Sequence, residues 1–246
     1  MARRWRAWHP HGGPPGSDVR LGDDEAHHIV RVLRLRAGEP LAVFDGEGRE
    51  WEGTIVEAQG GIVRVRLGEE LRDTVEAPLP LTLVQGLSRP DHVEWVVEKA
   101  TEVGVHAIVL ASCARSDGPP PSPSRLKRWH RIVLEAAKQS GRRRLPALPE
   151  PLPLGEATSG LQGTRIVLHP GGVPLASILE APPPPTVALA VGPEGGFEDA
   201  EVEALRAAGW EAASLGPRVL RTETAGPVAA ALVLHRWGDL GSTKPE

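Results

Sequence analysis

The chain is poor in the residues that build disulfides, metal clusters and membrane spans. Among its 246 residues there is one cysteine, Cys113, which excludes an internal disulfide and any zinc site made of several cysteines. No apolar run approaches the roughly 18 residues of a membrane-spanning helix. Residues 1–16 start basic but lack the apolar core of an export signal. We therefore expect a cytoplasmic protein without a metal ion or a membrane partner.

An overall surplus of positive charge is also absent, although single segments are strongly basic. The formal charge is −4, which argues against a uniformly basic nucleic-acid-binding protein. Residues 125–144 nevertheless carry eight Arg or Lys against Glu135 alone. Because arginine can hold a phosphate with a bidentate fork, we predict that the arginines after Gly141 contact RNA phosphates; these are Arg142, Arg143 and Arg144.

Residues 1–77 form the first predicted domain, a small β-rich unit. Alternating apolar runs at 41–46, 50–57 and 61–67 are separated by glycine-containing turns, which is the pattern of hairpins in a compact barrel. Arginine and tryptophan alternate at the amino terminus, and both base stacking on RNA and a frayed tail fit that pattern. The residues concerned are Arg3, Arg4, Trp5, Arg6 and Trp8.

A short helix is expected ahead of these strands, over residues 24–34. Its spacing turns Val32 inward with the apolar residues around it. Arg31 and Arg34 then face outward, where they suit contact with an RNA backbone. Solvated charges on a small barrel would give the same pattern.

The second predicted domain covers residues 78–246 and follows a proline-containing linker at 76–80. From there apolar strands alternate with helices. Their nearly uninterrupted apolar runs are typical of parallel strands covered on both faces, and they lie at 81–86, 105–111, 164–170, 186–193 and 211–216. The fold class is therefore α/β, with a mainly parallel sheet and helices on both of its faces.

The stretch with the most chemical content lies between Val191 and Ala225. Glycine turns at 192–196 and 215–218 each follow an apolar run, so both lie at the carboxyl ends of strands, where α/β proteins bind ligands. The first turn lacks the Lys-Ser/Thr of a phosphate loop and the spacing of a dinucleotide site. What it offers is exposed backbone N–H and C=O groups, which can hold an adenine edge without a charged side chain.

The last helix must begin where Pro227 is tolerated, and proline fits best in a first turn, whose N–H groups are free. This places the N-cap near Thr224. Arg221, Thr222 and Glu223 are then expected in the approach to the helix, beside its positive end.

Three blocks of this stretch and its surroundings match a known family: LHP at 168–170, VGPEGGF at 191–197 and LGPRVLRTETA at 215–225. They resemble the bacterial 16S ribosomal RNA uridine-N3 methyltransferases, which belong to the SPOUT class of trefoil-knotted methyltransferases. Further matching blocks lie at 27–48, 98–105 and 135–146, so the resemblance covers nearly all of residues 20–240. Glu198, where a Ser or Thr cap is common, and Gly226-Pro227 depart from the family pattern.

The resemblance implies a PUA-like RNA-binding β-barrel in residues 1–77 and a knotted methyltransferase domain in 78–246. It also implies a homodimer that methylates N3 of one uridine in 16S ribosomal RNA, in the decoding region of the small subunit, with S-adenosylmethionine as methyl donor. Carried over by motif, the cofactor residues are Leu168, His169, Pro170, Val191, Gly192, Pro193, Glu194, Gly195, Gly196, Leu215, Gly216, Arg218, Val219, Leu220, Thr222, Thr224 and Ala225.

Methylation at uridine N3 requires removal of its proton, because the protonated nitrogen is a poor nucleophile at neutral pH. We expect a proton acceptor and a cation for the charge that spreads onto the uracil oxygens. Our hypothesis assigns the cation to Arg221, and assigns Glu223 either the base or the orientation of Arg221. A helix cap or a structural ion pair would also account for Glu223. His169 is interpreted as a wall of the cofactor loop, and Arg218 fits either the cofactor pocket or RNA.

Two other function classes stay open. One is a non-catalytic factor with the same fold, which would bind ribosomal RNA but not S-adenosylmethionine. The other is a SPOUT methyltransferase with a different target atom, the ribose 2′-O or guanine N1.

Overall fold

The computed structural model describes residues 5–72, 75–116 and 120–242. Its contacts divide the chain into two compact units. The first unit contains residues 1–76 and 137–145, and the second contains 77–136 and 146–246. The basic segment around residues 142–144 therefore belongs to the first unit, although a long stretch of sequence separates it from the strands of that unit.

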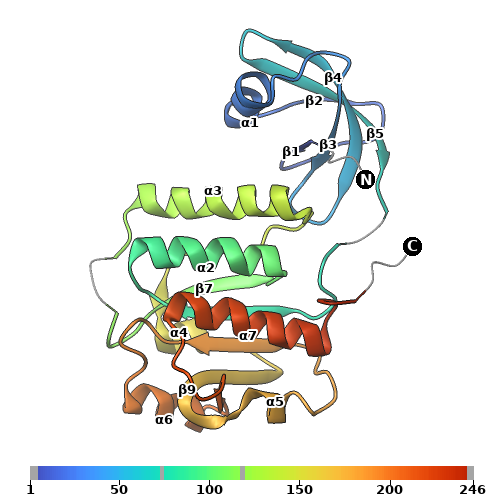
Figure 1. Ribbon diagram of the computed structural model, residues 1–246. Coiled ribbons are helices and arrows are strands. Elements are labelled where there is room, and N and C mark those ends of the chain that lie inside the picture. Colours follow the sequence, from blue (N-terminus) through green and yellow to red (C-terminus); the bar gives the residue numbers. More distant parts are fainter. Residues whose placement is uncertain (1–4, 73–74, 117–119, 243–246) are drawn as a thin grey trace. The chain divides into compact units, whose positions relative to one another are not determined.

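A five-stranded sheet with the order β1-β3-β4-β5-β2 forms the first unit (Figure 1). β1 is parallel to β3, and every other neighbouring pair is antiparallel. The bounds are β1 Arg6–Trp8, β2 Asp18–Arg20, β3 Pro40–Phe44, β4 Glu50–Gln59 and β5 Ile62–Glu70. β3, β4 and β5 correspond to the three strands that the alternating runs predict. Trp51, Ile55 and Val65 are among the buried side chains at its core.

The predicted helix of the first unit is present but changes its type midway. α1 spans Asp23–His27, and the chain continues as a π-helical turn, η1, over His28–Leu33. A π turn closes i→i+5 hydrogen bonds, so side chains in it rotate away from the face that α-helical spacing assigns. Val32 is accordingly 60% exposed, and its predicted inward orientation is wrong. Arg31 and Arg34 are exposed, as predicted.

The second unit contains a six-stranded sheet in which every neighbouring pair is parallel. Its strand order is β11-β9-β10-β6-β7-β8. The bounds are β6 Leu81–Gly86, β7 Ala107–Ser112, β8 Leu152–Pro153, β9 Thr164–Pro174, β10 Val187–Val191 and β11 Glu211–Ser214. The predicted parallel sheet is confirmed, and all five residues of β10 are buried, as expected for a strand covered on both faces.

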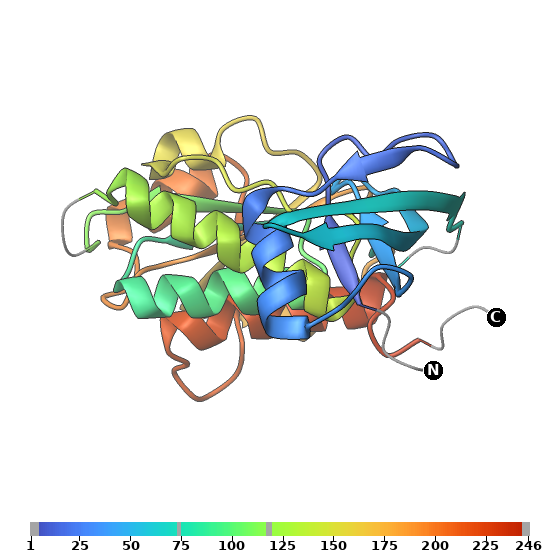
Figure 2. The ribbon, with the colours of Figure 1, turned by 90° about the horizontal axis from the view of Figure 1, so that it is seen from above.

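Helices cover the two faces of this sheet. α2 and α7 pack against each other, and α7 lies against β10 and β6 (Figures 1 and 2). Ala188 and Ala190 point the other way, into a cluster with Leu154 of α4 and Val202 of α6. The helices are α2 Pro90–Val103, α3 Pro123–Ser140, α4 Leu154–Thr158, α5 Leu175–Ile178, α6 Asp199–Ala207 and α7 Thr222–Trp237. In the part of the chain that the structure describes, no helix is long and apolar enough to cross a membrane.

The start of α7 differs from the prediction. Its N-cap is Arg221 rather than Thr224, and Pro227 lies inside the helix. Pro227 has no N–H to offer the carbonyl of Glu223, so the helix loses one hydrogen bond there. The first turn is instead held by the Arg221 carbonyl, which accepts hydrogen bonds from the N–H groups of Thr224 and Ala225 at 2.9 Å each. Tertiary contacts of this turn, described below, override the local preference of proline.

Candidate functional site

A cavity of about 740 Å³ lies in the second unit, at the carboxyl ends of β10 and β11 and beside residues 168–170 in the middle of β9. This is a volume typical of small-molecule sites. Every residue predicted to hold the cofactor lines it except Thr224, which is exposed. Its walls are residues 168–170, 191–197, 213–223 and Ala225, together with His92 and Arg115.

The first glycine loop, at 192–196, has a shape that side chains would prevent. A Cβ on Gly192 would lie 2.8 Å from the backbone nitrogen of Phe197. A Cβ on Gly86, at the end of β6, would lie 2.5 Å from the nitrogen of Pro193. Gly196 has a φ of +70°, which favours glycine. The loop thus packs closely on the sheet and keeps its backbone open to the cavity.

The second loop, at 215–220, presents apolar side chains at the rim of the cavity. Gly216 turns the chain with a φ of +114°, and its N–H donates a 3.2 Å hydrogen bond to Ser214 Oγ. Beyond the turn, Val219 is 86% exposed. A side chain this exposed at the rim of a cavity is available to a ligand or to another chain.

Thr222, in the first turn of α7, joins this turn to the first loop through its hydroxyl. Thr222 Oγ1 donates a 2.5 Å hydrogen bond to the carbonyl oxygen of Gly192 and accepts one of 2.7 Å from Gln85 Nε2. Gln85 is fully buried. The hydroxyl of Thr222 is therefore engaged within the protein, and its part in the site is to hold the loop in place. Sequence reasoning missed Gln85; the available signal was one amide in the otherwise apolar strand LTLVQG.

Arg221 and Glu223 lie together at the cavity, as the sequence predicts. Arg221 Nη1 is 3.9 Å from Glu223 Oε1, and the two side chains are 83% and 14% exposed. Glu223 Oε2 is buried and has no hydrogen-bond partner among the described residues. A carboxylate that is nearly buried, beside a cation that is free to move, can accept a proton from a bound molecule and balance its charge.

His92, in the first turn of α2, is a site residue that sequence reasoning missed. Its Nδ1 lies 2.9 Å from Glu194 Oε1 and 3.6 Å from Glu223 Oε2. Glu194 also accepts a 3.0 Å hydrogen bond from the backbone N–H of Arg89. Burial opposes ionisation of Glu194, but the hydrogen bonds from Arg89 and His92 outweigh it and hold the pKa of this carboxyl below its ordinary value.

Arg115 braces the first loop from the side of β7 and was also missed. Its Nη1 donates a 2.9 Å hydrogen bond to the carbonyl oxygen of Gly195.

The neighbouring Cys113 is buried, and this burial raises the pKa of its thiol to about 12. Cys113 is consequently a neutral thiol at physiological pH and has no role as a nucleophile.

Two further residues predicted for the site, His169 and Arg218, line the cavity. His169 Nδ1 accepts a 3.1 Å hydrogen bond from the N–H of Gly171, which fits a wall of the cavity better than a base. Arg218 lines the cavity and is exposed. The structure contains no group of three or more His, Cys, Asp or Glu side chains that could hold a metal ion among the residues it describes.

The basic cluster after α3 is mostly buried, which corrects a prediction. Arg142 and Arg143 are 3% and 5% exposed. Arg142 Nη2 lies 2.9 Å from Glu76 Oε2, and Arg143 Nε lies 2.9 Å from Glu50 Oε2. Buried charges persist only when they are paired, and these two are paired inside the first unit. The predicted contact with RNA phosphates is therefore wrong for Arg142 and Arg143, whereas Arg144 is exposed.

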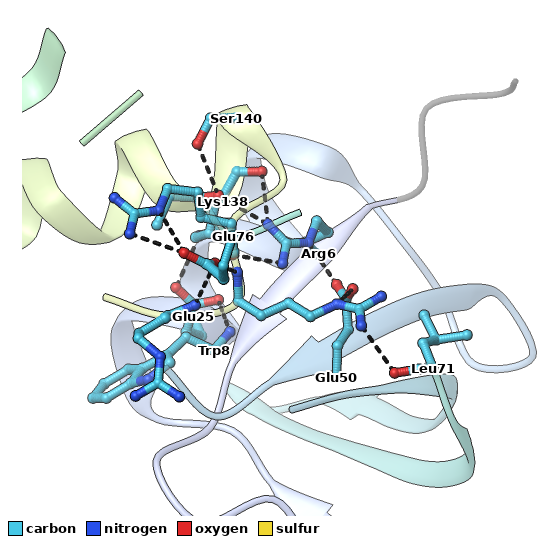
Figure 3. A network of polar contacts seen from close by, with 12 residues as sticks. Arg6, Trp8, Glu25, Glu50, Leu71, Glu76, Lys138 and Ser140 are labelled. Carbon is cyan, nitrogen blue, oxygen red and sulfur yellow. Dashed lines mark hydrogen bonds and ion pairs between the residues drawn. The ribbon is translucent and has the colours of Figure 1, made fainter. Parts of the chain in front are cut away.

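The same network includes the amino-terminal segment. Arg6 Nε donates a 2.6 Å hydrogen bond to Glu50 Oε1 (Figure 3), and its guanidinium lies over the ring of Phe44 at 4.5 Å. Trp8 Nε1 donates to the carbonyl of Asp45 at 3.1 Å. Arg6 and Trp8 are thus ordered parts of the sheet rather than a frayed tail, while Arg3 and Arg4 lie outside the described residues.

Comparison with known proteins gives matches over both units. Residues 75–234 match the family model of an RNA methyltransferase domain, and residues 21–68 match that of an RNA methyltransferase PUA domain. A ribosomal RNA small subunit methyltransferase E of Mycobacterium bovis is 35% identical over 237 residues, covering 90% of this chain and 89% of the relative. The enzyme of the same name from Synechocystis is 34% identical over 221 residues, covering 87% and 72%.

One solved structure aligns with nearly the whole chain. It is a ribosomal RNA small subunit methyltransferase E from Neisseria gonorrhoeae bound to S-adenosyl methionine. The identity is 31%, the TM-score is 0.90, and the alignment covers 96% of this chain and 99% of the other.

Proposed function

The chain belongs to the ribosomal RNA small subunit methyltransferase E family, and we propose from this that it methylates N3 of a uridine in 16S ribosomal RNA. Membership itself supports methylation of small-subunit ribosomal RNA with S-adenosylmethionine as donor. The predicted fold class, a SPOUT methyltransferase domain with a PUA-like domain before it, is confirmed. What we propose beyond family membership is the target atom, uridine N3, and the location of that uridine in the decoding region.

The cavity fits the methyl donor. Its volume of about 740 Å³ suits a nucleoside-sized ligand. The backbone of 168–170, 192–196 and 215–220 would hold the donor through N–H and C=O groups, with Ala225 and Leu220 as apolar contacts. When bound, S-adenosylmethionine supplies a methyl group on a sulfonium, a transfer that depends on alignment more than on acid catalysis.

The observation that carries the choice of acceptor is the pair Arg221–Glu223. For each methyl group that N3 gains, the proton on N3 must leave. Glu223 takes that proton on its buried carboxylate, which has no competing hydrogen-bond donor on Oε2. The exposed guanidinium of Arg221, 3.9 Å away, stabilises the negative charge on the uracil oxygens.

The two domains divide the work in this proposal. The first unit, residues 1–76 and 137–145, contacts ribosomal RNA through exposed cations, of which Arg31, Arg34 and Arg144 are the candidates. The second unit binds the donor and carries out the transfer. Arg218, exposed at the rim of the cavity, contributes to either partner. Such an enzyme acts in the cytoplasm, on ribosomal RNA within the small subunit.

A homodimer is part of the proposal and is supported by exposed apolar side chains on α2 and α7. Trp95 is 52% exposed, Leu232 is 44% exposed and Val228 is 37% exposed. The two helices pack side by side. Exposed apolar residues on neighbouring helices are typical of a surface that another chain covers.

Primer extension on ribosomal RNA tests the proposed target atom. N3 methylation blocks Watson–Crick pairing, so RNA treated with enzyme and S-adenosylmethionine should stop reverse transcriptase at one uridine, and RNA treated without donor should not. A ribose methyltransferase would instead leave a linkage resistant to alkali. A non-catalytic binding factor would produce neither signal.

A further inference from the structure

Three segments that are distant in the sequence meet at one imidazole. His92 lies in the first turn of α2, Glu194 in the first glycine loop and Glu223 in the first turn of α7. The side chain of His92 is 18% exposed, and its Nδ1 is 2.9 Å from Glu194 Oε1 and 3.6 Å from Glu223 Oε2. On the other side of the ring, Nε2 is 3.9 Å from Asp91 Oδ2. The imidazole is thus surrounded by carboxylates.

Glu194 uses its carboxylate to hold α2. Its Oε1 accepts hydrogen bonds from the backbone N–H of Arg89 at 3.0 Å and from the ring of His92 at 2.9 Å. Both donors precede or open α2, so Glu194 fixes the start of this helix against the glycine loop. The sequence assigns Glu194 to the cofactor. In the structure its carboxylate binds the start of α2 instead.

Glu223 needs such a fixed neighbour. Its Oε2 is buried without a hydrogen-bond partner, so the carboxylate is free to rotate unless a neighbouring group defines its position. Glu223 would also repel the charged Glu194 if nothing stood between them. The imidazole of His92 stands there: Nδ1 is hydrogen-bonded to Glu194 and lies within ion-pair distance of Glu223 Oε2, at 3.6 Å. With the imidazole in place, Glu223 keeps Oε1 toward Arg221, at 3.9 Å from Nη1.

We propose that His92 and Glu194 are positioning residues for Glu223: Glu194 orients His92, and His92 in turn sets the carboxylate that takes the proton from the RNA base. This inference rests on the proposed function, because it assigns Glu223 the proton. The proposal also assigns different tasks to two parts of the site. The cofactor loops hold S-adenosylmethionine. The bridge, which consists of Glu194, His92 and Glu223, positions the carboxylate that takes the proton.

Two pairs of variants test the bridge. His92→Ala removes the imidazole between the two carboxylates, whereas His92→Asn keeps an amide N–H near the position of Nδ1, where it can donate to Glu194. Glu194→Ala removes the acceptor, whereas Glu194→Gln keeps an oxygen for Arg89 and His92. Each variant is measured for S-adenosylmethionine affinity by calorimetry, for kcat and KM on ribosomal RNA, and for thermal unfolding.

Both alanine variants should lower kcat by about tenfold or more, because a base that is poorly placed loses much of its contribution. The affinity of His92→Ala for S-adenosylmethionine should stay within about twofold of the native value, because Thr222 and Arg115 hold the loop at 192–196 through Gly192 and Gly195. His92→Asn and Glu194→Gln should recover most of the lost kcat.

The inference is overturned if His92→Ala keeps native kcat, if its loss of kcat follows a loss of cofactor affinity, or if the asparagine and glutamine variants rescue nothing. If His92→Ala does not fold, the Glu194 pair decides by kcat at saturating S-adenosylmethionine and by its recovery in Glu194→Gln. The methylated nucleoside made by the native enzyme is identified in the same experiment. Native enzyme that makes no 3-methyluridine contradicts the proposed function, whereas an unaffected His92→Ala variant contradicts the bridge alone.

Discussion

Thr222 Oγ1 donates a 2.5 Å hydrogen bond to the carbonyl oxygen of Gly192, and this contact joins the first turn of α7 to the first loop of the cavity. Gln85 Nε2 completes the arrangement from β6, at 2.7 Å from the same hydroxyl. Gly226 makes the approach possible, because a Cβ there would lie 2.9 Å from Gln85 Oε1. The loop, the helix and the sheet are thereby fixed to one another at a single buried point.

Removing the Thr222 hydroxyl should destabilise the protein. Thr222→Val keeps the shape but leaves the Gly192 carbonyl without this donor and Gln85 Nε2 with its 3.4 Å hydrogen bond to the Gly86 carbonyl alone, at a cost of about 1–3 kcal/mol. Thr222→Ser keeps the hydroxyl and should stay closer to the native free energy of unfolding. Denaturant unfolding of the three proteins measures this difference, and equal stability of the valine and serine variants would contradict the contact.

Gly192→Ala should weaken binding of S-adenosylmethionine, because the added Cβ would lie 2.8 Å from the nitrogen of Phe197 and displace the loop. We expect a loss of about tenfold or more in affinity, equivalent to about 1.4 kcal/mol. Gly155→Ala is the matched control, since a Cβ there has no neighbour within 4 Å. Calorimetric titration of both variants checks the prediction; native affinity in Gly192→Ala would refute it.

Arg143→Ala should act on stability rather than on RNA binding. Its loss removes the 2.9 Å pairing with Glu50 and the hydrogen bond to the Leu71 carbonyl. Breaking a buried ion pair costs about 3–5 kcal/mol. Arg6 still pairs with Glu50, so we expect the lower end of this range. Unfolding measurements give the stability, and an unchanged salt dependence of RNA affinity separates this residue from a phosphate contact.

The basic cluster shows where sequence reasoning is limited. A run of arginines looks the same whether it faces solvent or pairs with buried acids. The acids that decide the matter, Glu50 and Glu76, lie 93 and 66 residues away from their partners. Exposure of Arg31 and Arg34 agrees with the prediction from helical spacing, whereas the same spacing fails for Val32, because the π turn over His28–Leu33 rotates its side chains.

The two glycine loops of the cavity were predictable because their sequence signals are local. Glycine turns that follow apolar strands are local signals, and parallel strands bring their carboxyl ends to one edge. Gln85, His92 and Arg115 act across separations of 137, 102 and 80 residues, which no spacing in the sequence expresses. The start of α7 was misplaced because the buried contacts of Thr222 outweigh the preference of Pro227 for a first turn.

Replacing Arg31 and Arg34 should weaken RNA binding in a salt-dependent manner. Each phosphate contact contributes about 0.7–0.9 to the slope of log affinity against log salt concentration. The double variant Arg31→Gln with Arg34→Gln should therefore reduce that slope by up to about two units. Arg206→Gln, at another exposed arginine, serves as the control. A slope that equals the native value would remove these residues from the RNA interface.

Cys113 should resist alkylation in the folded protein. Burial raises the pKa of its thiol to about 12, so almost none of it is the reactive thiolate at pH 8. In the unfolded chain the pKa falls to an ordinary value, and iodoacetamide should then react readily. The pKa of the thiol is higher in the folded protein than in the unfolded chain. The contribution of the neutral thiol to the free energy of unfolding is therefore fully present below the unfolded pKa and is lost as the pH rises toward 12. Rapid labelling of native protein at pH 8 would contradict the assignment.

The most direct measurement of the proposed activity follows the methyl group itself. Unmodified small subunits are incubated with the enzyme and S-adenosylmethionine carrying a labelled methyl group, and the 16S ribosomal RNA is then digested to nucleosides and separated against standards. We predict that the label elutes with 3-methyluridine and that Glu223→Gln lowers its yield. Label in a 2′-O-methylated nucleoside or in methylguanosine, or no label in the RNA, would contradict the account.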